Sequence, residues 1–190
     1  MTGPRMCFVN LFALICGSSA HAQSFSDYPQ ARIETYQVRG NTSAEIFASI
    51  TRNAPGTIPG TIGAGQQAHA SAYTQFHWTK RQSGGFCEFE VRMESHVVFP
   101  QHIDPAGLSD EAWRWWSDYA RTLERHEAGH LKIAHETYPD LLFALENGPC
   151  DTANARAEAV LEDLNYRQAR YDRVTNHGAN QAAISARSFR

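Results

Sequence analysis

The sequence predicts an α+β fold, because period-two patterns typical of strands occupy its first half and helical patterns occupy its second half. We expect an antiparallel sheet that packs on a long helix, with a further helix at the C-terminus. The long helix carries the order His-Glu-x-x-His at positions 126–130, a pattern typical of metal-binding helices. The chain shows no internal repeat and no linker that would divide it into two domains.

Residues 1–22 have the layout of a secretory signal peptide. Arg5 precedes an apolar run that ends at Cys16, and Ala20-His21-Ala22 forms an Ala-x-Ala cleavage site. The run is too short to span a membrane comfortably. A lipoprotein signal at Cys16 is a weaker alternative, because Ile15 stands where a small residue is usual. We therefore expect a signal peptide over 1–22, one domain over 23–190, and an exported protein that is periplasmic or secreted.

The charge of the chain argues against two classes of partner. The formal net charge is −3, and removal of Arg5 with the signal makes it −4. This balance gives no electrostatic basis for binding nucleic acid or an anionic membrane surface. After the signal, no apolar segment is long enough to span a bilayer.

Four cysteines are present, and Cys7 and Cys16 leave with the signal. In an exported protein the remaining pair, Cys87 and Cys150, is expected to form one disulfide that ties the strand region to the helical region. Metal binding by these two thiolates is the alternative, but no Cys-x-x-Cys spacing supports it.

Three strands are expected in the first half. Residues 33–40 alternate in period two, and residues 70–80 and 86–99 flank Gln82-Ser83-Gly84-Gly85, which indicates an antiparallel hairpin. A short helix is expected over 44–52, followed by a loop from Pro55 to Gly65. The histidines of this region share no ligand spacing, so we expect surface positions for His69, His77, His96 and His102.

Two helices are expected in the second half. Ser109 is suited to cap a helix that starts near Asp110. Pro139 is expected to kink or restart this helix, and the apolar pattern continues to Gly148. A last helix is expected from about Thr152 to Val174.

His126 and His130 are four residues apart, so a helix projects both from nearly the same face. Two imidazoles placed in this way can share one Zn²⁺ through their ring nitrogens. Glu127 lies near the centre of the apolar stripe of the helix, where an unpaired carboxylate is costly. A bound cation removes this cost and leaves Glu127 as a general base for water on the metal.

A catalytic zinc site commonly has a third protein ligand and one position for water. The segment from Tyr171 to Gly178 gathers a phenol, a carboxylate and an imidazole at an expected helix end. The neighbours of the motif, His135 and Glu136, would point away from it on an unbroken helix. The candidate third ligands, in order of preference, are His177, Asp172 and Glu158.

The chain resembles a bacterial family described as predicted secreted zinc-dependent proteases, long labelled a domain of unknown function. The similarity lies in His126-Glu127-x-x-His130, Gly85-Phe86-Cys87, Cys150 and Tyr171-Asp172-x-x-Thr175-x-His177-Gly178. It covers the chain roughly from Tyr36 to Gln181. The resemblance implies a zincin-like fold and an exported enzyme, and it supplies no substrate.

These observations predict an exported zinc peptidase that acts on a peptide or protein. Glu127 is expected to take a proton from the attacking water, and Tyr171 or a protonated histidine to stabilise the oxyanion. Three alternatives stay open at this point. They are a periplasmic binding or assembly protein with a structural or vestigial metal site, a metal-free domain with a hydrogen-bonded His/Glu cluster, and a hydrolase of peptidoglycan cross-links. The sequence does not determine the oligomeric state.

Overall fold

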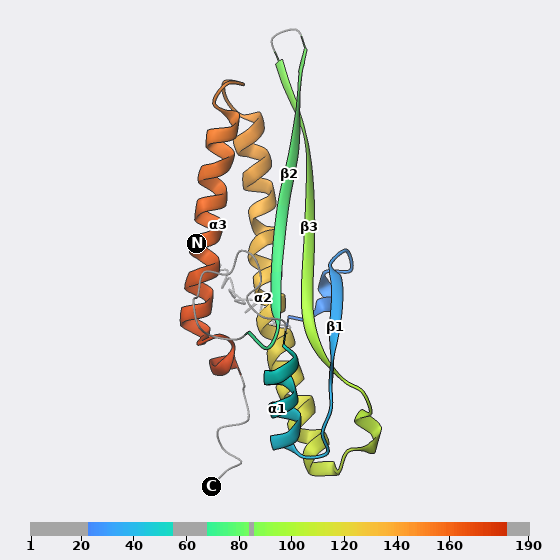
Figure 1. Cartoon of the computed structure of the whole chain (residues 1–190). Coiled ribbons are helices and arrows are strands. Elements are labelled where there is room, and N and C mark those ends of the chain that lie inside the picture. Colours follow the sequence, from blue (N-terminus) through green and yellow to red (C-terminus); the bar gives the residue numbers. More distant parts are fainter. Residues whose placement is uncertain (1–22, 55–67, 84–85, 182–190) are drawn as a thin grey trace, which may run out of the picture.

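The computed structural model describes residues 23–54, 68–83 and 86–181 (Figure 1). The expected signal peptide and the expected loop from Pro55 to Gly65 lie outside the described residues. The described chain is α+β, as predicted: a three-stranded mixed sheet packs against a long helix and a C-terminal helix. Among the described residues, no helix is both long and apolar enough to cross a membrane.

The sheet has the strand order β1-β3-β2, with β1 at Arg32–Val38, β2 at Ser71–Ser83 and β3 at Phe86–His102. The expected antiparallel hairpin is confirmed, because β2 pairs antiparallel with β3 and Ala72 stands opposite Val97. The expectation of a wholly antiparallel sheet is wrong, because β1 pairs parallel with β3, with Ile33 opposite Val97. Period-two alternation records which face of a strand is buried and carries no information about strand direction.

Helix α1, Ser43–Asn53, begins with a capping box in which Thr42 and Glu45 bind each other's backbone N–H groups. Its buried residues Ile46 and Ile50 pack with Val38 of β1 and with Trp116 of α2. His102 also lies in this region and is buried, not on the surface as expected. Its Nε2 lies 2.9 Å from the carbonyl oxygen of Gly40, which satisfies the ring inside the core.

Helix α2, Asp110–Glu146, runs without a break and contains Pro139, so the helix does not restart at this residue. Proline removes one helical hydrogen bond, and this costs about 3 kcal/mol in an exposed helix. The turns that follow Pro139 are held by packing: Leu141 and Leu145 are buried with Ala153 and Ala157 of the next helix. These tertiary contacts therefore offset the cost of the proline inside the helix.

Helix α3, Ala153–Thr175, lies beside α2, and the β2–β3 hairpin runs along the same pair of helices (Figure 1). A disulfide joins Cys87 of β3 to Cys150 in the turn between the helices, as predicted. Asn176 and His177 then adopt left-handed backbone angles, and a short 3₁₀ turn follows at Ala179–Gln181. The chain thus turns back toward α2 at the end of α3.

Candidate metal centre

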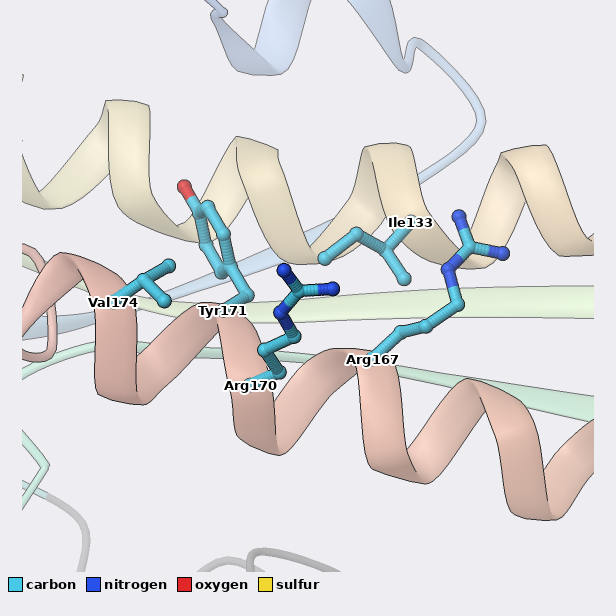
Figure 2. A pocket seen from close by; sticks show the side chains of 5 residues that line it. All are labelled: Ile133, Arg167, Arg170, Tyr171 and Val174. Carbon is cyan, nitrogen blue, oxygen red and sulfur yellow. The ribbon is translucent and has the colours of Figure 1, made fainter.

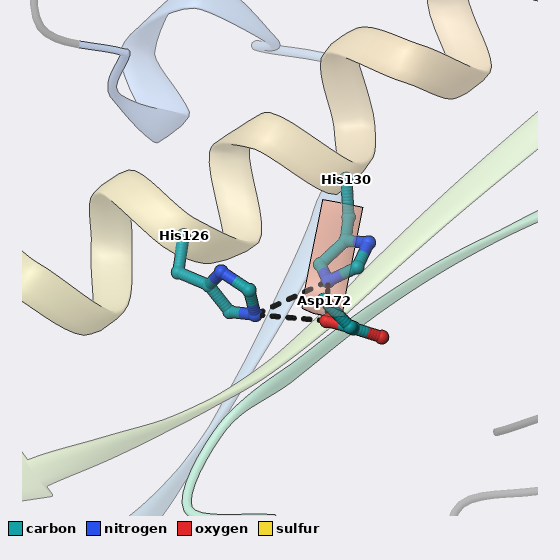
Figure 3. A group of neighbouring side chains, drawn as sticks. All are labelled: His126, His130 and Asp172. Atoms are coloured by element: carbon teal, nitrogen blue, oxygen red, sulfur yellow. Dashed lines mark hydrogen bonds and ion pairs between the residues drawn. The ribbon is translucent and has the colours of Figure 1, made fainter. Parts of the chain in front are cut away.

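His126 and His130 of α2 meet Asp172 of α3 between the two helices (Figure 3). The Oδ1 atom of Asp172 lies 3.2 Å from Nε2 of His126 and 2.9 Å from Nε2 of His130. The two Nε2 atoms are 3.2 Å apart. The side chains of His126, His130 and Asp172 are 6%, 12% and 30% exposed, respectively. The three side chains therefore offer one ligand atom each to a common point.

The donor set fits a zinc ion. A tetrahedral ion with ligand bonds of about 2.0–2.1 Å places neighbouring donors about 3.3 Å apart. The three observed separations, 2.9 to 3.2 Å, need to open by only a few tenths of an ångström. Two imidazole nitrogens and one carboxylate oxygen are also the ligand types that zinc prefers.

The other two candidate ligands are not part of this group. His177 is 63% exposed, and its Nδ1 lies 3.7 Å from Oδ1 of Asp172. Its left-handed backbone follows the end of α3, and its ring stays outside the group of ligand atoms that lie within 4.8 Å of one another. Glu158 is exposed on α3, and its 14-residue separation from Asp172 corresponds to about 21 Å along a helix. Of the three candidate third ligands predicted from the sequence, the structure thus brings Asp172, the second in order of preference, to the two histidines.

Glu127 is buried, with 4% of its surface exposed, and is not one of the three gathered side chains. Burial raises the pKa of its carboxyl group, against the opposing effect of His130, His126 and a backbone hydrogen bond from Ala72 of β2. The carboxylate therefore lies beside the candidate ligands and also contacts the sheet. A water molecule bound to an ion at this site would therefore lie close to the carboxylate of Glu127.

The electrostatics of the ligand group favour positive charge between its members. Burial opposes protonation of His130, but the hydrogen bond that its ring donates to Asp172 and the charge of Glu127 outweigh this effect, and the pKa of His130 is raised. Burial likewise opposes ionisation of Asp172, but hydrogen bonds from His126 and His130 lower its pKa well below the usual range. The same negative charges would favour a metal cation at this point.

Two glutamines complete the surroundings of the imidazoles, and the sequence alone did not single them out. Oε1 of Gln168 lies 2.6 Å from Nδ1 of His130, and Oε1 of Gln181 lies 3.1 Å from Nδ1 of His126. Gln168 is four residues before Asp172, so helical spacing could have placed it on the same face. No local pattern points to Gln181, which reaches His126 only because the chain turns back after α3.

Tyr171 packs against both imidazoles. Its ring is stacked on that of His126 with a centroid distance of 5.2 Å, and it meets the His130 ring edge-on at 5.0 Å. Its hydroxyl accepts a hydrogen bond of 2.7 Å from Nε2 of Gln181. A Cβ atom at Gly129 would collide with the phenol oxygen of Tyr171. The missing side chain at position 129 thus provides the space that the phenol fills.

A pocket of about 270 Å³ is lined by residues of α2 and α3. The ring of Tyr171 forms one of its walls (Figure 2). The other walls of the pocket come from both helices and consist of Ile133, Arg167, Arg170 and Val174. Two of these side chains end in guanidinium groups. The three candidate ligands do not line it. Tyr171 therefore separates this pocket from the ligand group.

The fold and the site together define an α+β domain with a candidate metal centre built between two adjacent helices. The chain belongs to the family described as "Bacterial protein of unknown function (DUF922)", which matches residues 33–178. No curated protein and no solved structure matches the chain.

Proposed function

We propose that the protein is an exported, zinc-dependent, zincin-like peptidase in which His126, His130 and Asp172 hold the ion. One observation carries the proposal: three ligand atoms from two helices converge, and a buried carboxylate lies beside them without joining the group. Three protein ligands leave a fourth position for water, as in catalytic zinc sites. Asp172 replaces His177 as the preferred third ligand because Asp172, and not His177, belongs with both imidazoles to the group of ligand atoms within 4.8 Å of one another.

The catalytic roles follow from the positions of the side chains. Zinc in this site would act as a Lewis acid and lower the pKa of water toward neutrality. Glu127 accepts a proton from the attacking water and delivers it to the leaving amine. A backbone hydrogen bond from Ala72 of β2 also reaches this carboxylate. Tyr171 accepts from Gln181 and keeps its own hydroxyl proton, which makes it our candidate donor to the oxyanion.

The disulfide supports the exported location, because such bonds persist in oxidising compartments. The substrate in this proposal is a peptide or protein, with zinc as the cofactor. A binding or assembly protein with a structural metal is the rival function. The three-ligand set favours hydrolysis over this rival, because structural zinc sites are usually closed by four protein ligands.

The test is to purify the protein without a histidine tag, measure its metal content, and follow cleavage of a broad peptide library. Glu127→Gln should retain zinc and lose turnover by at least about 100-fold, since general base catalysis contributes about that much. Asp172→Ala should lose both zinc and turnover. Glu158→Gln, which changes an exposed carboxylate far along α3, is the matched control that should retain both. Bound zinc without cleavage of any peptide would favour the rival function, and absence of zinc binding would refute the proposal.

A further inference from the structure

We infer that the pocket lined by Arg167 and Arg170 is a substrate subsite that binds a carboxylate, either an acidic side chain or the C-terminal carboxylate of a peptide. The inference rests on the proposed function, which makes a peptide the ligand. It does not require that the protein cleave the peptide that it binds, so the two proposals can fail separately.

Arg167 places a fixed positive charge in the wall of this pocket. Its Nη1 atom donates a hydrogen bond of 3.2 Å to the hydroxyl of Thr137, and this hydroxyl donates its own proton to the carbonyl oxygen of Ile133 at 2.8 Å. The Nη2 atom of Arg167 lies 3.4 Å from Oε2 of Glu136. Thr137 is buried, so these contacts hold the guanidinium group against α2. A guanidinium group has five N–H donors, and the contacts leave several of them for a ligand.

Arg170 supplies a second positive charge, and no acidic side chain within the described chain neutralises it. Its side chain makes no hydrogen bond or ion pair with another residue that the structure describes. The residues three and four positions away on α3, where helical partners lie, include no acid: Tyr166, Arg167, Arg173 and Val174. Both guanidinium groups reach from α3 toward α2, with Ile133 between them (Figure 2).

The pocket therefore has an unmatched positive charge, although the formal net charge of the whole chain is −3. Glu136, the acid that contacts Arg167, is shared with Lys132, whose Nζ atom lies 3.8 Å from its Oε1. One acid thus serves two cations, and Arg170 has no acid of its own. A carboxylate is complementary to this charge, and arginine binds carboxylates with two parallel hydrogen bonds where the geometry permits.

The size and the walls of the pocket suit a short side chain or a chain end that carries the carboxylate. Its volume of about 270 Å³ is below the range of about 300–1,000 Å³ that holds a whole small molecule. Ile133, Val174 and the ring of Tyr171 provide apolar walls beside the two guanidinium groups. The methylene groups of an acidic residue would contact these walls while its carboxylate meets the arginines.

Tyr171 lies between this pocket and the ligand group. Its ring is stacked on that of His126 with a centroid distance of 5.2 Å, and the same ring forms a wall of the pocket. Arg170 precedes Asp172 by two residues, which is about 3 Å along a helix. An extended peptide advances about 3.3 Å per residue. The carboxylate would therefore belong to a residue within about two positions of the cleaved bond.

The test compares the binding of peptides that differ in one carboxylate. Two series are capped at both ends and carry Glu or Gln at one fixed position among randomised neutral residues. A third series carries Gln at that position and a free C-terminal carboxylate. Fluorescence anisotropy of the dye-labelled peptides gives their dissociation constants, with the Glu127→Gln protein as the binding partner so that no peptide is cleaved during the titration.

We expect either the Glu series or the series with a free C-terminus to bind about 10-fold more tightly than the capped Gln series, because a hydrogen bond to a charged group contributes about that factor. The series that binds more tightly identifies the source of the carboxylate. Arg170→Gln should abolish the preference. Arg173→Gln is the matched control: it removes the same charge from an exposed position on α3 that does not line the pocket, and it should keep the preference.

The outcomes separate this inference from the proposed function. Equal binding of all three series, no binding of any series, or a preference that survives Arg170→Gln would overturn the subsite, even if the wild type is an active peptidase. A preference that depends on Arg170, in a wild type that cleaves no peptide, would refute the proposed function alone.

Discussion

Gly129 is the most direct test of how Tyr171 is seated against α2. In a helix interior, Gly→Ala normally stabilises by about 1 kcal/mol because alanine has the higher helix propensity. Here the new Cβ would strike the phenol oxygen of Tyr171 and displace the ring. Overpacking costs about 1–3 kcal/mol, and loss of the Tyr171–Gln181 hydrogen bond costs about 1 kcal/mol more. Gly129→Ala should therefore lower the free energy of unfolding by about 1–3 kcal/mol.

The assay is urea unfolding of the metal-free protein, carried out as a double-mutant cycle with Tyr171→Ala. In the Tyr171→Ala background the obstacle is gone, so Gly129→Ala should recover its normal effect and stabilise the protein by up to about 1 kcal/mol. The sign of the substitution should reverse between the two backgrounds. A stabilising Gly129→Ala in the presence of Tyr171 would refute the close contact between the phenol and the helix.

Three further predictions concern stability. The pKa of Asp172 is lowered in the folded protein, so its contribution to stability is fully present above its ordinary pKa of about 4 and is lost as the pH falls through the lower folded value. Asp172→Asn should therefore flatten the loss of stability of the metal-free protein between about pH 4 and 2. An acid unfolding profile equal to that of the parent would contradict this prediction. Thr42→Ala removes the cap of α1 and should cost about 1 kcal/mol in urea unfolding, whereas no loss would mean that the cap contributes nothing. Replacement of Cys87 and Cys150 by alanine opens a cross-link with a sequence separation of 63 and should cost about 2–4 kcal/mol, and a melting temperature equal to that of the parent would exclude a stabilising disulfide.

The sequence was informative about the site wherever the relevant geometry is local. His126 and His130 lie on one turn of a helix, so their spacing alone predicts that they face the same way. The choice between Asp172 and His177 was not local, because it depends on how α3 is rotated against α2 and on where its last turn ends. His177 adopts a left-handed backbone conformation after that turn and is 63% exposed.

The same holds for the fold: features set by local sequence were predicted, and features that depend on distant segments were not. Cys87 and Cys150 could be paired by elimination, and the hairpin followed from its turn residues. The direction of β1 and the continuity of α2 through Pro139 depended on packing between distant segments. A period-two pattern is identical in parallel and antiparallel strands, and a local helix breaker does not report the tertiary contacts that compensate for it.

The hydrogen bond from Ala72 to Glu127 separates two requirements of the proposed enzyme. The three gathered side chains come from α2 and α3, whereas Glu127 also contacts a strand. In the proposed enzyme, a substitution in β2 that displaces Glu127 is therefore expected to leave metal binding intact and to lower turnover.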